Sequence, residues 1–416
     1  MSQHNEPSRI AAIMLSWLDL ELISCTTMQG LWAGYGHICA ISAKPAANCA
    51  SAKWHRLSQA QGNDQDSAIR LVLKIVHPPT KTGDEGHLRK MFSYEVEQYF
   101  YDEVAPRLAS SGVPVAQCFA STRSMKQKAI DHGIDHVMAT LLNDLRPEFP
   151  VAGEKRAILF ANQVYAALAW LAKFHSNSWA HLPQDLSDFL LPPLEEAKKR
   201  KKDAKCDGSN LWLNGGYTYL ATRQEEYRLL AHDHFSEWSD VFCSSVDGLP
   251  SLAEAAADFL IPRGRPFETY IHGDVKSENL FSTESGDDVV FFDFQYAGIG
   301  LGVCDLAKLF TCSVPVGLLT NHKSIPSSLK MDDNEKILLK HYWSILMNNR
   351  PQGDIPVYEW DVFLRHWETA LVDWCRFQAS WGFWGNTEWL EARVRFITQD
   401  EGWRDWLQRQ LQISSN

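Results

Sequence analysis

The sequence lacks the features that would place it at once in a disulfide, zinc or membrane class. Its nine cysteines include no Cys-x-x-Cys pair, which argues against a zinc ligand set and against a secreted disulfide framework. The apolar stretch that starts at Ile10 is interrupted by Asp19 and Glu21, and the N-terminus before it is polar and not basic. This pattern is neither a signal peptide nor a membrane span. We therefore expect a reducing compartment, the cytoplasm.

The chain also lacks an excess of basic residues. Its 40 Lys and Arg against 51 Asp and Glu give a formal net charge of −11. That balance disfavours nucleic acid or an anionic membrane as the main partner, and it favours a cationic or neutral substrate. The 416 residues, 45% hydrophobic and 22% charged, are typical of a globular protein with two domains or one large unit of two lobes.

Residues 270–305 concentrate polar side chains in a largely apolar setting. These side chains fall in two groups separated by a short apolar strand: His272, Asp274, Lys276 and Asn279, then Asp293. A loop, a strand, a turn and a second strand would bring Asp274, Asn279 and Asp293 together. One proton acceptor with two hard oxygen ligands is what Mg²⁺-dependent phosphoryl transfer needs.

A glycine-rich segment near the N-terminus lies between two strand-like runs, around residues 22–28 and 37–43. It contains Gly34 and Gly36, and a glycine-rich hairpin lets backbone N–H groups approach phosphates without side-chain obstruction. A plain tight turn explains the same residues when they are considered alone. Both interpretations stay open at this point.

A single lysine, Lys74, interrupts the buried-strand pattern of residues 69–76. Such a lysine is usually a snorkelling edge residue, but it is also placed to reach the α- and β-phosphates of a nucleotide. The helix expected over residues 88–108 carries Glu95 and Glu97, and a helix glutamate is a known partner for a phosphate lysine. Glu97 is preferred because aromatic residues that follow it would dock its turn on the sheet. A solvated carboxylate is the simpler interpretation of either residue alone.

The expected sheet continues with strands over residues 113–120 and 135–142, and residues 141–147 have the composition of a linker. Backbone groups near Asn143 and Leu145 are candidates to bond an adenine edge. The two lobes predicted on this basis are an N-terminal nucleotide-binding lobe, residues 1–142, and a C-terminal catalytic and acceptor-binding lobe, residues 143–416.

The C-terminal hundred residues are rich in tryptophan, with acidic residues interleaved. Trp367, Trp374 and Trp381 recur every seven residues, which places them on one face of a helix. Core packing is the simpler interpretation. In the alternative, some of them line an acceptor pocket in which aromatic faces and carboxylates suit an ammonium group.

The order His272-x-Asp274-x-Lys276-x-x-Asn279, followed by Asp293-Phe294, resembles the catalytic and metal-binding loops of the protein-kinase-like fold. It is most similar to the small-molecule branch, which comprises the aminoglycoside phosphotransferase, choline kinase and ecdysteroid-kinase-like families. The resemblance covers about residues 30 to 305. It implies an α+β, bilobed fold whose N-lobe is an antiparallel sheet plus helix and whose larger C-lobe is mainly helical.

The resemblance also implies roles for individual residues. Asp274 is the base that takes the proton of the acceptor hydroxyl, and Lys276 neutralises charge on the transferred phosphoryl group. Asn279 and Asp293 are the ligands of the Mg²⁺ ions that accompany ATP. His272 is a buried scaffold, and Asp305 braces the catalytic loop from the next helix. The implied nucleotide-binding residues are Gly34, Gly36, Lys74, Glu97, Asn143 and Leu145.

Two departures from protein kinases narrow the function. Gln295 replaces the glycine of Asp-Phe-Gly, and only eleven residues separate Asp293 from Asp305, which leaves no room for a long activation segment. The sequence therefore predicts an ATP-dependent phosphotransferase that acts on a hydroxyl of a small-molecule metabolite. The acidity of the chain and its tryptophans favour a cationic or amphiphilic alcohol as the acceptor. The alternative is a catalytically silent kinase-like protein that binds a nucleotide or a partner. Silent relatives commonly lose the base, a metal ligand or the lysine, and all are present here.

Overall fold

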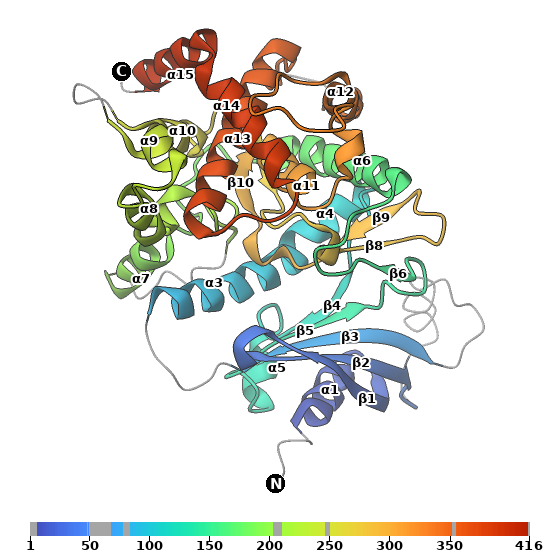
Figure 1. The fold of residues 1–416 in the computed structure, drawn as a ribbon. Coiled ribbons are helices and arrows are strands. Elements are labelled where there is room, and N and C mark those ends of the chain that lie inside the picture. Colours follow the sequence, from blue (N-terminus) through green and yellow to red (C-terminus); the bar gives the residue numbers. More distant parts are fainter. Residues whose placement is uncertain are drawn as a thin grey trace. The chain divides into compact units, whose positions relative to one another are not determined.

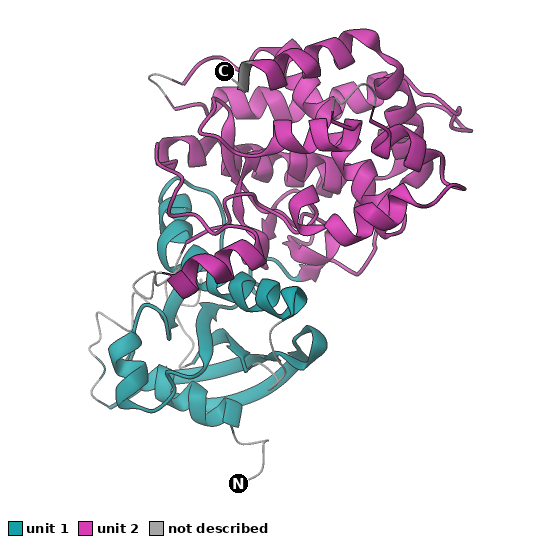
Figure 2. Cartoon of the chain, turned by 90° about the vertical axis from the view of Figure 1, so that its left-hand side faces the viewer, with its two compact units in different colours: residues 1–150 teal, residues 151–416 magenta. Residues whose placement is uncertain are grey.

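The computed structural model forms two compact units, Met1–Pro150 and Val151–Asn416 (Figures 1 and 2). The predicted division after residue 142 would cut off Asn143, which is the last residue of strand β5 (Met138–Asn143). The residues that the structure describes are 6–47, 49, 68–77, 84–202, 210–245, 250–351 and 355–414. Among them, no helix is long and apolar enough to cross a membrane.

The first unit is built on a five-stranded antiparallel sheet. Its strands are β1 (Leu20–Gly30), β2 (Gly36–Pro45), β3 (Ile69–Val76), β4 (Cys118–Ser121) and β5. They pair in the order β1-β2-β3-β5-β4, so β3 lies at the centre. Helix α1 (Glu6–Ser16) contributes Ile10 and Met14 to the core that Leu71 and Leu73 of β3 form on one face. Helix α5 (Lys126–Asp131) connects β4 to β5. The predicted antiparallel N-terminal sheet is confirmed.

The helix expected over residues 88–108 is interrupted in the structure. Helix α3 (Glu85–Tyr99) begins after Asp84, whose carboxylate accepts the His87 N–H at 2.6 Å. A π-helical turn (Phe100–Val104) follows, and then helix α4 (Ala105–Ser110). Pro106 lacks the N–H that an α-helix would donate to residue 102, so the regular pattern fails there.

Gly34 and Gly36 close the β1–β2 hairpin for different physical reasons. A Cβ atom on Gly36 (φ +147°) would lie 1.9 Å from the Ile75 carbonyl oxygen, whereas one on Gly34 (φ +74°) would meet nothing within 4 Å. We expect Gly36→Ala to lower the free energy of unfolding by about 2 kcal/mol. The matched variant Gly34→Ala should cost about 1 kcal/mol, for backbone strain alone. Denaturant unfolding of both variants checks this, and equal losses would contradict the packing explanation.

The second unit is mainly helical, which confirms the expected C-terminal architecture. Its helices are α6 (Ala161–Ser178), α7 (Pro193–Lys202), α8 (Gln224–Ala231), α9 (Glu237–Cys243), α10 (Leu252–Leu260), α11 (Val303–Cys312), α12 (Asp333–Asn348), α13 (Trp360–Trp381), α14 (Thr387–Gln399) and α15 (Glu401–Ser414). Two small antiparallel sheets join them, β10 (Gly298–Leu301) with β7 (Glu268–Ile271), and β6 (Val151–Ala152) with β8 (Leu280–Ser282) and β9 (Val289–Phe291).

The regularly spaced tryptophans of α13 pass from the core to the surface. Trp367 is fully buried, and its Nε1 donates to Glu335 Oε1 at 2.9 Å. The other oxygen of Glu335 accepts from Arg393 Nε at 2.8 Å. Trp374 is 4% exposed and Trp381 is 55% exposed. Core packing therefore explains Trp367 and leaves Trp381 unexplained.

Candidate active site

A buried carboxylate from α11 holds the predicted catalytic loop. Asp305 accepts the His272 N–H at 2.7 Å and the Gly273 N–H at 2.9 Å. Nε2 of His175 on α6 donates to the same carboxylate at 3.2 Å. Burial raises the pKa of Asp305, but the His175 hydrogen bond and the charge of Lys308 outweigh it, so the pKa is lowered. The bracing contact that the resemblance implies is present.

His272 links the two polar groups of the motif as an uncharged side chain. It is fully buried, and burial lowers its pKa. Its Nε2 lies 2.9 Å from the Phe292 carbonyl oxygen, and the Asp274 N–H approaches its Nδ1 at 3.3 Å. A neutral ring with the proton on Nε2 satisfies both contacts. His272 therefore ties Asp274 to the residue that precedes Asp293.

Asp274 lies at the centre of a network of short polar contacts. Its Oδ2 is 3.0 Å from Lys276 Nζ and accepts from Asn279 Nδ2 at 3.0 Å. Lys276 also pairs with Glu278 at 2.9 Å. Burial lowers the pKa of Lys276, but the two carboxylates raise it by more, so a fixed positive charge stands beside Asp274.

The β8–β9 hairpin places Asn279 and Asp293 at the same end. Asn279 ends the short helical turn before β8, and Asp293 comes two residues after β9. The Phe292 N–H donates to the Asn279 carbonyl at 3.0 Å. Asp293 has a left-handed backbone (φ 66°, ψ 60°), and its carboxylate accepts from Gln295 Nε2 at 2.6 Å. Such conformations in residues other than glycine are costly and cluster at functional sites.

These two side chains fit a Mg²⁺ site of the kind that substrate phosphates complete. Asn279 Nδ2 donates to both the carbonyl and the carboxylate of Asp274, which leaves Oδ1 of Asn279 as a possible ligand atom. Within the described ranges, no group of three His, Cys, Asp or Glu side chains could hold a metal alone. Mg²⁺ typically takes one or two protein oxygens, with phosphate oxygens and water as the remaining ligands.

In the first unit, the predicted lysine–glutamate pair is present. Lys74 Nζ lies 2.5 Å from Glu97 Oε2, and the two side chains are only 12% and 7% exposed. Lys74 also lies 5.4 Å from the centre of the Tyr94 ring. Because β3 is the central strand, the edge-residue interpretation of Lys74 is wrong. Its role toward a nucleotide stays a prediction.

The other predicted nucleotide-binding positions already use some of their backbone groups. The Gly34 N–H donates to a carbonyl within the hairpin at 3.1 Å. The Asn143 N–H donates to the Gln117 carbonyl at 3.0 Å, and the Leu145 carbonyl accepts from the Phe149 N–H at 2.9 Å. Contacts from these positions to a nucleotide stay predictions.

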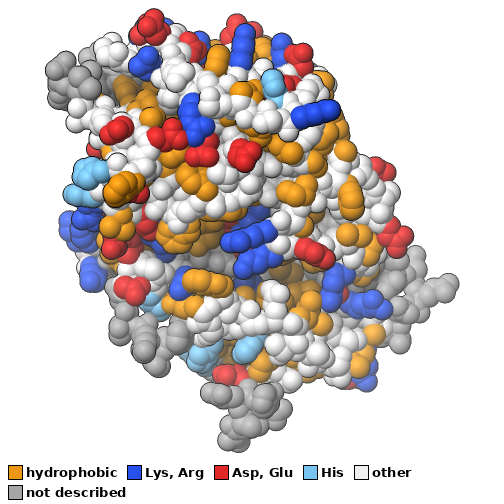
Figure 3. Space-filling model, viewed as in Figure 1, with side chains coloured by type: hydrophobic (Ala, Val, Ile, Leu, Met, Phe, Trp, Pro, Cys, Tyr) orange, Lys and Arg blue, Asp and Glu red, His pale blue; other side chains and the backbone are white. Residues whose placement is uncertain are grey.

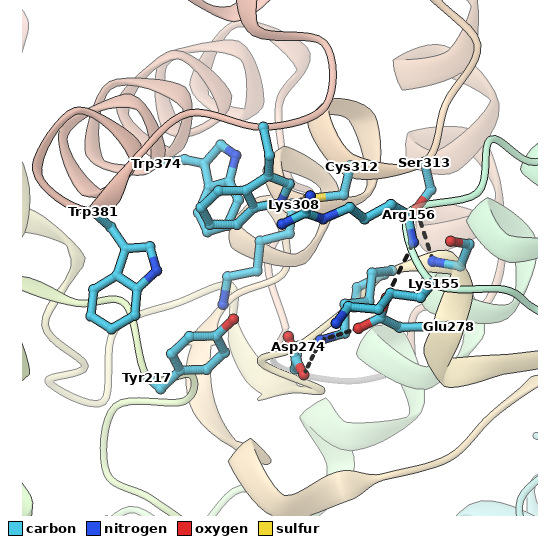
Figure 4. A pocket seen from close by; sticks show the side chains of 14 residues that line it. Lys155, Arg156, Tyr217, Asp274, Glu278, Lys308, Cys312, Ser313, Trp374 and Trp381 are labelled. Carbon is cyan, nitrogen blue, oxygen red and sulfur yellow. Dashed lines mark hydrogen bonds and ion pairs between the residues drawn. The ribbon is translucent and has the colours of Figure 1, made fainter. Parts of the chain in front are cut away.

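A cavity of about 210 Å³ opens beside Asp274 within the second unit (Figure 4). Fourteen residues line it: Lys155, Arg156, Tyr217, Asp274, Val275, Lys276, Ser277, Glu278, Lys308, Cys312, Ser313, Trp374, Trp381 and Trp384. Trp374 and Trp381 are in its wall, so the alternative interpretation, that some tryptophans line an acceptor pocket, stays a prediction.

The lining residues that were not recognised from the sequence include Lys155, Arg156, Tyr217 and Lys308. A signal for Tyr217 does exist in the Gly215-Gly216 pair before it. The Gly216 N–H donates to the Tyr296 carbonyl at 2.9 Å, and a Cβ on Gly215 would lie 2.5 Å from the Ile271 side chain. The pair thus packs against the strands that flank the catalytic loop and places Tyr217 beside them.

Comparisons with known proteins show which family and which solved structures the chain is similar to. The model of the ecdysteroid kinase-like family matches residues 47–325, which is 279 of the 416 residues. No curated protein matches the chain. Similar solved structures include an ethanolamine kinase of Plasmodium vivax, with 12% identity, a TM-score of 0.41, and 99% of this chain and 84% of that chain covered. A choline kinase of Streptococcus pneumoniae has 13% identity and a TM-score of 0.39, with 96% of this chain and 99% of that chain covered. A macrolide 2′-phosphotransferase of Brachybacterium faecium has 11% identity and a TM-score of 0.40, with 97% of each chain covered.

Proposed function

The chain belongs to the ecdysteroid kinase-like family, and on this premise we propose that it is an ATP-dependent small-molecule kinase. It would transfer the γ-phosphoryl group of MgATP to a hydroxyl of a metabolite. The observation that carries the proposal is Asp274, which lines a small-molecule-sized cavity while Lys276 and Asn279 hold its carboxylate. The eleven residues between Asp293 and Asp305 form a short turn, β10 and the start of α11, which supports a small acceptor over a peptide.

The proposed chemistry assigns one task to each side chain of the loop. The acceptor hydroxyl donates a hydrogen bond to Asp274, which takes its proton as the new O–P bond forms and the bond to ADP breaks. Lys276 stabilises the negative charge of the group in transfer. Asn279 and Asp293 would hold Mg²⁺, which would supply further charge neutralisation on the phosphates when bound. In the first unit, Lys74 is the proposed phosphate lysine, kept in place by Glu97.

The test is ADP release from MgATP with a panel of hydroxylated metabolites. We expect release that requires both an acceptor and a divalent cation. A thermal shift with MgATP separates the competing hypothesis, because a silent kinase-like protein would bind MgATP and turn over no member of a broad panel. That result would favour the hypothesis of a nucleotide-binding protein without catalytic activity over the hypothesis of an enzyme.

We expect Asp293→Asn to remove the Mg²⁺-dependent part of the MgATP thermal shift. A neutral amide is a much weaker magnesium ligand than a carboxylate, while the Tm without nucleotide should change little. The matched control is Asp287→Asn, which removes an exposed carboxylate from the turn of the same hairpin and should keep the full shift. A large fall in the nucleotide-free Tm of Asp293→Asn would indicate a structural role instead.

A further inference from the structure

The cavity beside Asp274 is locally basic in an acidic chain. Its charged lining residues are Lys155, Arg156, Lys276 and Lys308 against Asp274 and Glu278, whereas the whole chain carries −11. Figure 3 shows that charge is unevenly spread, with Lys and Arg side chains gathered near the centre of the face in view. Lys276 is balanced by both carboxylates. Lys308 is buried, with its Nζ donating to the Gly273 carbonyl.

Lys155 and Arg156 carry the positive charge that remains. Both are exposed in the segment between β6 and α6, and neither side chain has an ion pair or hydrogen bond with any residue that the structure describes. Arg156 has a left-handed backbone (φ 59°), and its N–H donates to Glu278 Oε2 at 3.3 Å. Glu278 therefore holds the Arg156 backbone in an unfavourable conformation at the cavity wall and leaves the guanidinium unpaired.

The opposite side of the cavity is aromatic. Figure 4 shows Trp381 and Tyr217 on one side of Asp274 and Lys155 and Arg156 on the other. Trp381 is 55% exposed at the end of α13. Phe377 stacks on this indole with ring centres 6.0 Å apart, and the part of the indole that stays exposed offers apolar surface to a ring system.

The aromatic rings already have protein cations beside them. Lys308 Nζ lies 5.9 Å from the ring centres of both Tyr217 and Trp374, and the Arg223 guanidinium lies 4.8 Å from that of Trp381. A ligand ammonium group would meet like charge at each of these three rings, and like charges repel. The cationic acceptor suggested by the net charge is therefore disfavoured by the lining residues.

We propose, on the basis of the proposed function, that the acceptor is an alcohol with a flat apolar ring scaffold and an anionic group. The rings stack against Trp381 and Tyr217, and the hydroxyl meets Asp274. Lys155 and Arg156 bind the anionic group, which is a carboxylate, sulfate or phosphate ester, through charge-assisted hydrogen bonds.

Three matched probes test the proposal by isothermal titration calorimetry. They are 6-(hydroxymethyl)-2-naphthoate, its uncharged methyl ester and the analogue that carries an aminomethyl group in place of the carboxylate. We expect the carboxylate to bind about tenfold more tightly than the ester, and the amine to bind most weakly. The preference should shrink as salt is added, because the two cations are exposed.

The double variant Lys155→Gln, Arg156→Gln should reduce the preference for the carboxylate to less than about threefold. The Kd of the ester should not change, and Gln keeps a Cβ at residue 156, so the backbone strain is the same. The matched control is Lys323→Gln, another exposed lysine, which should keep the wild-type preference. Equal Tm values for the three proteins show that folding is intact.

Three results would overturn the proposal. The first is equal binding of the carboxylate and the ester, or tightest binding of the amine. The second is no binding of any probe. The third is a weaker affinity for MgATP in the double variant with an unchanged acceptor preference, which would assign the two cations to the nucleotide. Because calorimetry needs no turnover, a carboxylate preference without ADP release contradicts only the proposed function. ADP release without the preference contradicts only this inference.

Discussion

Asp274→Asn is expected to lower kcat on the order of 10²-fold or more while leaving the affinity for MgATP within a few fold. Removing a positioned general base typically has this effect on rate. The residual rate would come from the remaining charges, because Lys276 and the metal ligands stay in place. ADP release under saturating acceptor measures kcat, and calorimetry with MgATP measures binding.

The structure makes the Asp274 substitution conservative in shape. Asn fills the same volume, and its amide oxygen can still face Lys276 Nζ, which lies 3.0 Å from the native carboxylate. Lys276 Nζ and Asn279 Nδ2 both contact Oδ2 of Asp274, so an amide oxygen at that position can keep both contacts. Asp287→Asn, in the turn of the β8–β9 hairpin, controls for the loss of one negative charge nearby in the sequence. Equal turnover by Asp274→Asn and wild type would remove Asp274 from the proposed chemistry.

The proximity of the candidate catalytic residues could be predicted from the sequence because they are close in the chain. Asp274, Asn279 and Asp293 lie within twenty residues, and one β-hairpin is enough to bring two of them together. Lys74 and Glu97 lie on a central strand and the helix that follows, a short connection with clear periodicity. Local patterns of this kind can be recognised without knowledge of the tertiary fold.

The lining of the cavity beside Asp274 could not be predicted from the sequence in the same way. Arg156, Tyr217, Lys308 and Trp381 come from four separate segments, and only tertiary packing makes them neighbours. No spacing rule connects all four, and the net charge of −11 does not reveal that four of the charged lining residues are basic and two are acidic. The net charge of a whole chain does not determine the charge of a cavity lined by fourteen residues.

The predicted ends of one strand are wrong for local reasons that are visible in the structure. The strand expected over residues 113–120 is only Cys118–Ser121. The Val113 N–H donates to the Leu108 carbonyl at 3.1 Å, and Gly112 has a positive φ of 78°. These residues therefore terminate helix α4 and are not free to join the sheet.

Asp305→Ala is expected to lower the free energy of unfolding by about 4 kcal/mol, because it leaves several buried donors without an acceptor. Asp305 is fully buried and accepts from His272, Gly273 and His175. For a unit of this size the loss corresponds to roughly 10 °C in Tm. Asp258→Asn is the matched control, since it breaks an exposed pair with Arg263 and should cost less than about 1 kcal/mol. Similar losses in the two variants would mean that Asp305 does not brace the loop.

The pH dependence of Asp305 variants distinguishes an ionised carboxylate from a merely well-packed side chain. Burial raises its pKa, but the hydrogen bond from His175 and the charge of Lys308 lower it by more. The native state therefore holds fewer protons than the unfolded state, whose Asp pKa is about 3.9. A depressed pKa contributes stability that is fully present above that value and is lost as the pH falls through the folded value. The stability difference between wild type and Asp305→Asn should thus be constant near neutral pH and shrink in acid. A difference that persists unchanged to the lowest pH at which both proteins fold would show that the Asp305 charge does not stabilise the loop.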